Sequence, residues 1–318
     1  MSTYKLTLKR IADDWKLLLS IFVGFTIAAT LVAGAPVYLK TLERQGINTA
    51  VDRSPQISLN LAVFAPYVPL DRFSIEETDR AINRAVENNV AILYRGQERY
   101  LKTSLLLVGT ANQPISDEYG AVVSQGYFQQ LTNVADHLTF LSGVMATDKI
   151  VFADGKITVE GVISRQSSNA FGLQIGDIAS LPPSVDSPVQ VNVEVVGIVE
   201  ATDPREEFWQ GNAGTYLNPA PLTEDDEMPP LSVFISREAF IDGVGAAYPG
   251  SLVKSTWYIF VDKEGLKALS KEEFRDKFAT LESSIANSMQ RSDVMTGITK
   301  LLNEFEYRSF FSSVPLLL

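Results

Sequence analysis

An uncharged stretch of 23 residues near the N-terminus, residues 17–39, is the strongest pattern of apolar and polar positions in the chain. Twelve of these residues are Leu, Ile, Val or Phe. An α-helix rises about 1.5 Å per residue, so the stretch would be roughly 34 Å long, and the hydrocarbon core of a bilayer is about 30 Å thick. The pattern therefore predicts a transmembrane helix over residues 17–39.

A cleaved signal peptide is the alternative interpretation, because Ala33-Gly34-Ala35 has the small-x-small form of a cleavage site. The apolar stretch is longer than the roughly 7–15 apolar residues of a signal peptide, and Pro36 would directly follow the cut. We therefore expect the helix to be retained as an anchor.

The charges that flank the helix predict its orientation, because Lys and Arg concentrate on the cytoplasmic side. Four basic residues precede the helix and three follow it: Lys5, Lys9, Arg10 and Lys16, then Lys40, Arg44 and Arg53. We expect a cell-membrane protein with residues 1–16 in the cytoplasm and its main domain outside.

Residues 40–292 change repeatedly between strand-type and helix-type periodicity, which predicts a mixed α/β extracytoplasmic domain of the α+β class. Strict alternation of Val189, Val191, Val193 and Val195 with polar residues predicts a strand with one buried face. We expect strands or extended chain over residues 59–70, 90–94, 101–108, 157–163, 178–181, 189–199, 232–235 and 256–261, and helices over residues 127–140, 164–171 and 237–243.

Two segments have the [ST]-x-x-[DE] form of a capping box, in which the first and fourth residues satisfy each other's backbone amides. One is Ser74 to Glu77, which would open a helix ending near Asn88-Asn89. The other is Ser270 to Glu273, which would open a helix running to about Gln290. The first helix would bury one face made of Ile75, Ala81, Ile82, Ala85 and Val86.

Residues 202–230 form a long polar excursion with several prolines. It carries Phe208, Trp209 and Tyr216, whose large apolar surfaces need burial or a partner. We therefore expect the excursion either to bury these side chains or to present them to a partner.

Residues 293–318 are expected to form a stalk helix and the start of a second transmembrane helix. Ile298, Leu302 and Phe305 have helical spacing, and no charge follows Arg308. The uncharged run is too short to span a bilayer. We expect the natural chain to continue beyond Leu318; the alternative is a short apolar end.

Composition narrows the classes of function. The formal net charge is −11, and the chain after the first 16 residues carries −13. This acidic body argues against nucleic acid as a partner, because phosphate binding needs a basic surface. The chain has no cysteine, which excludes disulfides, zinc–thiolate sites and iron–sulfur clusters.

We predict no catalytic, cofactor-binding or metal-binding residues. The only histidine, His137, is expected on a helix surface or edge in a structural role, and no G-x-S-x-G motif accompanies it. The acidic run at residues 224–227 lacks the spacing of a calcium loop. Gly155-Lys156 is followed by Ile157 rather than Ser or Thr, and Gly243-Val244-Gly245 lacks a third glycine, so neither is a nucleotide loop. We therefore do not expect an enzyme.

The segment Asn169-Ala170-Phe171-Gly172-Leu173-Gln174-Ile175-Gly176-Asp177-Ile178 is the most informative motif of the body. It resembles the alanine, leucine-glycine-leucine, glycine-aspartate signature of the MacB/FtsX-like ABC transporter permease family, with Phe171 where leucine is usual. The flanks at 157–165 and 193–199 are similar to that family as well, and the match is weaker over residues 60–140.

The residues of the motif have roles in building the fold. Gly172 is expected to stop the helix with a positive φ, and Gly176-Asp177 to form a tight turn. Leu173 and Ile175 are expected to enter the core.

The resemblance implies a MacB-like periplasmic core domain and a defined set of partners. These are the lipid bilayer, a separate cytoplasmic ABC ATPase subunit, and a second permease copy or homologue. The chain would be the N-terminal part of a permease that couples ATP-driven helix motion to export or envelope work. The alternatives are a membrane-anchored sensor or scaffold that binds a peptide or envelope protein, and, less favoured, an anchored hydrolase.

Overall fold

The computed structural model describes residues 15–111, 113–116, 124–153, 155–222, 228–289 and 292–298. The chain divides into two compact units at Arg53. The described residues before this point form a single helix, and those from Ser54 to Ile298 form an α+β unit, which we call the outer unit.

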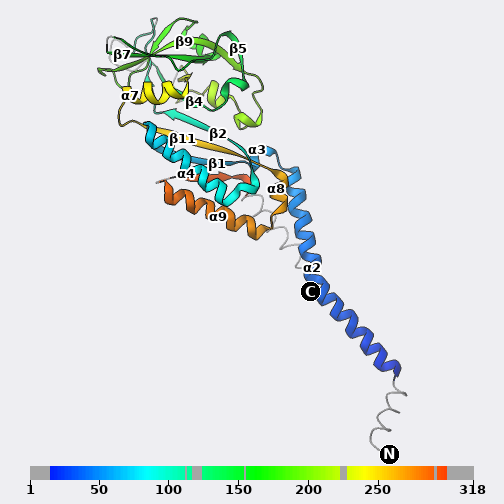
Figure 1. Ribbon diagram of the computed structural model, residues 1–318. Coiled ribbons are helices and arrows are strands. Elements are labelled where there is room, and N and C mark those ends of the chain that lie inside the picture. The colour runs from blue at the N-terminus through cyan, green and yellow to red at the C-terminus, as the bar shows by residue number, and fades with distance from the viewer. Residues whose placement is uncertain are drawn as a thin grey trace, which may run out of the picture. The chain divides into compact units, whose positions relative to one another are not determined.

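Helix α2 (Trp15–Arg53) is continuous over 39 residues (Figure 1). Its segment Trp15–Gly34 has a mean hydropathy of 2.3 and no buried residues. By length and composition this segment can cross a membrane, and it is the one such helix among the described residues. The helix continues past the predicted stretch of residues 17–39 as far as Arg53.

Hydroxyl groups within the apolar part of α2 are satisfied by the helix itself. The Oγ1 atoms of Thr26 and Thr30 each donate to a carbonyl four residues earlier, at 2.7 Å in both cases. Hydrocarbon offers no hydrogen-bond partner, so internal bonds of this kind let threonine occupy a spanning helix.

The outer unit is built on one mixed sheet with the strand order β12-β1-β11-β2-β4-β10-β7-β9-β5. The pairs β4–β10 and β7–β9 are parallel, and the other neighbours are antiparallel. The bounds along this order are Asp293–Thr296, Leu61–Pro69, Leu252–Val261, Tyr94–Thr103, Gln125–Leu131, Leu231–Phe234, Lys156–Ser164, Gln190–Ala201 and Leu138–Gly143. Short strands β3 (Leu106–Leu107), β6 (Ile150–Ala153) and β8 (Ile178–Ser180) pair with β4, β7 and β9.

The helices of the outer unit are mostly short. They are α3 (Gln56–Leu59), α4 (Arg72–Val90), α5 (Arg165–Phe171), α6 (Gly214–Leu217), α7 (Gly245–Ala247), α8 (Lys263–Ala268) and α9 (Lys271–Ser288). Single turns are η1 (Ala91–Leu93), η2 (Val134–His137) and η3 (Glu207–Trp209), and a π-helical segment η4 (Ala239–Val244) precedes α7. The predicted α+β class agrees with this arrangement.

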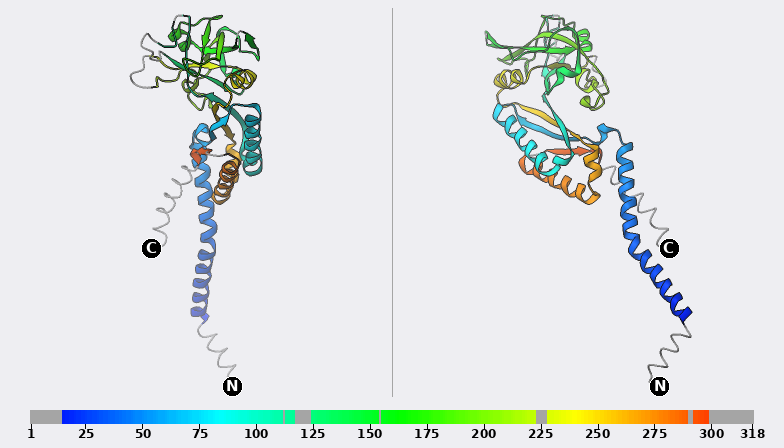
Figure 2. Two further views of the ribbon diagram at one scale, coloured as in Figure 1. Left: turned by 90° about the vertical axis from the view of Figure 1, so that its left-hand side faces the viewer. Right: turned by 45° about the vertical axis from the view of Figure 1, so that its right-hand side comes forward.

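Strands β12, β1, β11 and β2 form what we call the helix-covered half of the sheet. Helices α4 and α9 lie side by side against it (Figures 1 and 2). Leu61, Val63 and Ala65 alternate as buried residues along β1, which places one face of the strand in the core. The ladder to β11 is interrupted between Ala65 and Val68, where Pro66 has no amide hydrogen to donate.

Strands β7, β9 and β5, with β6 and β8, form what we call the crossover half. The chain leaves β7, passes through α5 and β8, and returns in β9 parallel to β7. Val191, Val193, Val195 and Val199 are all fully buried along β9, so the predicted alternation is confirmed from Val191 onward. Val189 lies before the strand, which starts at Gln190, and is half-buried. The strands predicted at 157–163, 178–181 and 232–235 and the helix at 164–171 are also present, as β7, β8, β10 and α5.

The helix predicted over residues 127–140 is wrong. Strand β4 occupies the first part, η2 forms a turn, and β5 follows. Tyr127 and Phe128 are both buried, on opposite faces of a central strand, which removes the one-sided pattern that separates strand from helix. Asn133 starts the turn with a left-handed φ of 57°.

Two strand predictions in the preceding segment need correction. Residues 91–93 form the turn η1 after α4, and the strand begins only at Tyr94. The strand predicted over 101–108 is split, because β2 ends at Thr103 and β3 contains only Leu106–Leu107.

The two predicted capping boxes have different outcomes. At α9, Ser270 Oγ accepts from the Glu273 amide, and the Glu273 carboxylate accepts from the Ser270 amide, as predicted. At α4 the cap is Asp71, whose carboxylate accepts from the Ser74 amide at 2.9 Å, so the helix begins three residues earlier than expected. The predicted apolar face of this helix is buried, with Ile75, Ile82 and Val86 in the core.

The predicted stalk helix does not begin at Asp293. Residues Asp293–Thr296 form strand β12 on the free edge of β1, with Val63 opposite Val294. The edge of β1 offers backbone hydrogen-bond partners to this segment, which precedes the residues with helical spacing. The remainder of the prediction, beyond residue 298, lies outside the described residues.

Candidate functional site

The motif that includes Gly172 builds a capped helix. Ser164 Oγ accepts from the Ser167 amide at 3.0 Å and so caps the start of α5. Gly172 ends the helix with a φ of 64°, and the Leu173 amide donates back to the Ser168 carbonyl at 3.0 Å. The predicted glycine C-cap is therefore confirmed.

The turn after α5 is also present. Gly176 has a φ of 89°, and its amide donates to the Val195 carbonyl of β9 at 2.9 Å. The Asp177 carboxylate accepts from the Gln174 amide at 2.8 Å. Leu173 is buried, but Ile175 is 45% exposed, so its predicted place in the core is wrong. Its side chain lies instead over Gly143, where a Cβ atom would come within 2.8 Å of Ile175 Cδ1.

The described part of the polar excursion, residues 202–222, packs on the sheet through its aromatic residues. Phe208, Trp209 and Tyr216 are buried in one apolar cluster with Val162, Val199 and Phe234. Of the two alternatives expected for these three aromatic side chains, burial or a partner, the structure shows burial.

Buried polar groups fix the position of the excursion. The Tyr216 carbonyl accepts from Gln129 Nε2 at 2.8 Å and from Ser232 Oγ at 2.6 Å. The Tyr216 hydroxyl donates to the Tyr258 hydroxyl at 2.9 Å, and the Tyr100 hydroxyl donates to Gln129 Oε1 at 2.9 Å. Burial raises the pKa of Tyr100, Tyr216 and Tyr258, so all three hydroxyls keep their protons, and those of Tyr100 and Tyr216 serve as hydrogen-bond donors.

His137 lies in the turn η2 rather than on an α-helix surface. Its ring stacks on Phe208 with centroids 3.6 Å apart, and Nδ1 is 2.8 Å from the Glu206 carboxylate. Both contacts are to the excursion, and neither is to a hydroxyl nucleophile. His137 therefore holds the excursion in place, which agrees with the structural role proposed from the sequence.

A groove of about 700 Å³ opens between α5 and the excursion. It lies at the carboxyl ends of the parallel strands β7 and β9, marked by Ser164 and Ala201. Ligands of α/β sheets commonly bind outside the carboxyl ends of parallel strands. The floor is apolar and consists of the buried residues Val199, Ala213 and Leu217.

The rim of the groove is polar and carries one ion pair. Arg165 Nη1 lies 3.0 Å from Glu200 Oε1, and both side chains are about half exposed, at 55% and 46%. The two charges offset each other, and no other charged residue lines the groove among the residues that the structure describes.

Three carboxamides complete the rim: Gln166 and Asn169 on α5, and Asn218 after α6. Within the described part of the chain, none of them forms a side-chain hydrogen bond. Each amide group therefore offers both a donor and an acceptor to a ligand.

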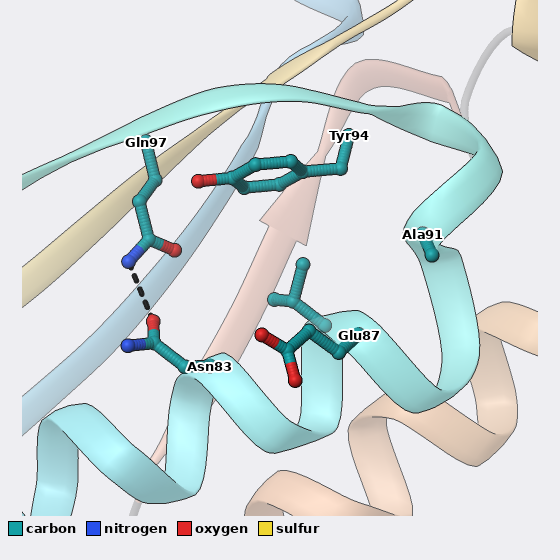
Figure 3. A pocket seen from close by; sticks show the side chains of 6 residues that line it. Asn83, Glu87, Ala91, Tyr94 and Gln97 are labelled. Carbon is teal, nitrogen blue, oxygen red and sulfur yellow. Dashed lines mark hydrogen bonds between the residues drawn. The ribbon is translucent and has the colours of Figure 1, made fainter.

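A smaller hollow of about 210 Å³ lies between α4 and the start of β2 (Figure 3). Gln97 Nε2 donates to Asn83 Oδ1 at 2.6 Å across one end, and the Tyr94 ring and Glu87 carboxylate face the same space. Its polar amides are already bonded to each other, so we regard the larger groove as the candidate functional site.

The motifs considered for catalysis or nucleotide binding are separated in the structure. Gly155 forms the turn between β6 and β7 with a φ of 73°, and Lys156 starts β7. Gly243-Val244-Gly245 lies inside the continuous helical segment of η4 and α7. Within the described ranges, no group of three His, Asp or Glu residues could hold a metal ion. The acidic run at 224–227 lies outside those ranges.

The groove was not predicted from the sequence. Its walls come from segments about fifty residues apart, and single Asn and Gln residues in polar segments carry no distinguishing pattern. The only available signal was that the motif at 169–178 and the aromatic excursion both stood out individually.

The chain was compared with known proteins by two routes. No protein-family model matches it, and no similar curated protein was found.

Proposed function

We propose that the chain is the N-terminal part of an ABC transporter permease: one transmembrane helix followed by an extracytoplasmic domain. The observation that carries the proposal is α2, whose apolar segment Trp15–Gly34 exposes its side chains over a length sufficient to cross a bilayer. The motif at 169–178, which resembles the permease signature, adds support because its helix cap and turn have the expected conformations.

The connections of the outer unit suit a protein that transmits motion. Helix α2 continues without interruption to Arg53, so a displacement of its membrane segment would reach the outer unit along a continuous helix. The chain then enters β1 at Leu61, and β12, which leads toward the predicted second membrane segment, is the hydrogen-bonded neighbour of β1. Relative motion of the two membrane segments would therefore act on adjacent strands.

Such a permease would have no catalytic residues of its own. Its cytoplasmic ATPase subunit would supply the energy, and a second permease copy or homologue would complete the transporter. The outer unit would handle its substrate on the extracytoplasmic side of the cell membrane.

Topology can be tested with single cysteines, because residues 1–318 contain none. Ser2→Cys and Ser184→Cys variants are expressed in intact cells and exposed to a membrane-impermeant maleimide. We expect labelling of the exposed residue 184 in intact cells, and labelling of residue 2 only after permeabilisation. Labelling in the opposite pattern, or recovery of the protein in the soluble fraction, would contradict the proposal.

The ATPase partner can be tested by purifying the full natural gene product from its own membranes in mild detergent. We expect a stoichiometric subunit with Walker motifs and vanadate-sensitive ATP hydrolysis in the purified complex. A membrane-anchored sensor or scaffold is the second candidate, and the groove favours it because the groove can bind a ligand without any catalytic group. Purification without an ATPase, combined with the expected topology, would favour that candidate.

A further inference from the structure

We propose that the groove between α5 and the excursion binds an extended peptide segment through the peptide main chain. The proposal concerns binding alone and holds whether the protein is a permease or a scaffold.

Buried hydrogen bonds hold both walls of the groove. Residue Leu217, in its floor, directly follows Tyr216, which is bonded through its carbonyl to Gln129 and Ser232. Ser164, at the opposite wall, caps α5 and is itself buried. Both walls are therefore held by buried hydrogen bonds, and a ligand would not have to order them on binding.

The three carboxamides match the chemistry of a peptide main chain. Gln166 and Asn169 are three residues apart on α5 and so lie on the same side of the helix, and Asn218 lines the groove from the excursion. An extended peptide presents amide donors and carbonyl acceptors in alternation, and each carboxamide can pair with one of each.

The floor and the charge balance restrict the ligand further. Val199, Ala213 and Leu217 favour apolar side chains on the inward face of the peptide. Arg165 and Glu200 offset each other, so the groove offers no excess positive charge for a phosphate-bearing ligand. An acyl chain would remove the carboxamides from water without replacing their hydrogen bonds, which is unfavourable.

The proposal is tested by panning a phage-displayed random nonapeptide library on the full chain in detergent. Counter-selection uses Ala170→Trp, which fills the groove from an exposed position on α5 and should leave the thermal midpoint unchanged. We expect nonapeptides that bind the natural protein and bind Ala170→Trp at least tenfold more weakly. Asn169→Leu should weaken the same peptides about tenfold, since it removes up to two hydrogen bonds.

Two matched controls distinguish main-chain recognition from non-specific binding. Gln174→Leu removes an exposed carboxamide just beyond α5 that does not line the groove, and it should leave affinity unchanged. A selected peptide resynthesised with alternate main-chain amides N-methylated keeps its side chains but loses donors, and it should bind at least tenfold more weakly.

Several outcomes would overturn the proposal. The first is that no selected peptide binds the natural protein more tightly than Ala170→Trp. The second is that the N-methylated peptide binds as tightly as the unmodified peptide. The third is that Gln174→Leu weakens peptide binding as much as Asn169→Leu does. Dansylundecanoate serves as an acyl-chain probe: its binding to the natural protein but not to Ala170→Trp, without peptide binding, would assign the groove to lipid instead.

Discussion

The helix-covered half and the crossover half of the sheet are stabilised in different ways. In the helix-covered half, strands from distant parts of the sequence pair with each other, as where Leu61 lies opposite Ile259, and two long helices bury one face. In the crossover half, β6 to β9 lie within residues 150–201, and tight turns and short caps connect them. The comparison shows that long-range burial dominates one half and local backbone geometry the other.

The two halves also differ in what they leave open. Helices α4 and α9 cover one face of the first, whereas only short segments pack beside the parallel strands of the second: helix α5, the π-helical segment η4 and the excursion, among the described residues. The groove lies in the space between α5 and the excursion. Short connections at the ends of parallel strands thus leave a concave surface that longer packed helices would have filled.

Trp257 and Trp209 provide the strongest test of this difference. Each is fully buried, Trp257 in the helix-covered half and Trp209 in the cluster beside the crossover half. Replacement by Ala should lower the free energy of unfolding by about 3–5 kcal/mol at either position. Replacement by Phe should cost about 1–2 kcal/mol more at Trp257, because its Nε1 donates to Asp79 at 3.0 Å, whereas Trp209 Nε1 has no hydrogen-bond partner among the described residues.

These variants are compared by guanidinium unfolding of the full chain in detergent, followed by far-ultraviolet circular dichroism. If the two Phe replacements lower the free energy of unfolding equally, the hydrogen bond from Trp257 to Asp79 of α4 does not distinguish the two halves.

Alkaline pH should weaken the crossover half through Tyr248. Its hydroxyl donates to the Leu181 carbonyl at 2.6 Å and accepts from the Val191 amide at 2.9 Å, and burial raises its pKa to about 12. An unfolded tyrosine has a pKa of about 10, so the unfolded chain loses this proton first. The stabilisation is complete below about pH 10 and is lost as pH rises toward 12, by roughly 2–3 kcal/mol.

The comparison variant is Tyr248→Phe, which should lose stability at neutral pH but decline less steeply between pH 10 and 12. Tyr94→Phe, at an exposed tyrosine, should follow the natural protein at every pH. Parallel pH curves for Tyr248→Phe and the natural protein would exclude this role for Tyr248. Stability is measured as the urea midpoint at each pH.

Gly172 tests the importance of local geometry in the crossover half. Replacement by Val should lower the free energy of unfolding by about 1–3 kcal/mol, because a β-branched residue does not readily adopt the observed φ of 64°. Gly172→Asn should cost less, since Asn tolerates left-handed conformations. The thermal midpoint of each variant measures the effect, and an unchanged midpoint for Gly172→Val would reject the cap assignment.

The smallest expected effect concerns the cap of α9 in the helix-covered half. Ser270→Ala removes the hydroxyl half of the capping box and should cost about 1 kcal/mol. Ser74→Ala, at the motif that does not cap α4, should change stability by less than about 0.5 kcal/mol. Hydrogen exchange of the backbone amides in the first turn of each helix, α9 for Ser270→Ala and α4 for Ser74→Ala, measures the loss of stability. Equal losses in the two variants would contradict the assignment of the caps.

Local signals in the sequence were sufficient for several elements. The alternating valines predicted which face of β9 is buried, and Gly172 predicted the end of α5. Ser270 with Glu273 predicted the start of α9. In each case the residues that form the element also carry its determinant, within one or two turns of chain.

Elements whose determinants lie elsewhere in the chain were misassigned. The segment containing Gln129 has no strand-type alternation, and its buried amide is satisfied only by Tyr100, Ser232 and Tyr216, from three other segments. Asp293–Thr296 is a strand because the edge of β1 offers backbone partners to it.

The sequence by itself determined that an apolar helix precedes an acidic α+β body and that the motif at 169–178 forms a capped helix and turn, because hydropathy and glycine conformation act over a few neighbouring residues. Only the tertiary structure decided which strands are neighbours, where Phe208, Trp209 and Tyr216 are buried, and that Asn169 and Asn218 line one groove. Those features depend on contacts between distant segments, whose free energy arises only when the whole sheet has formed.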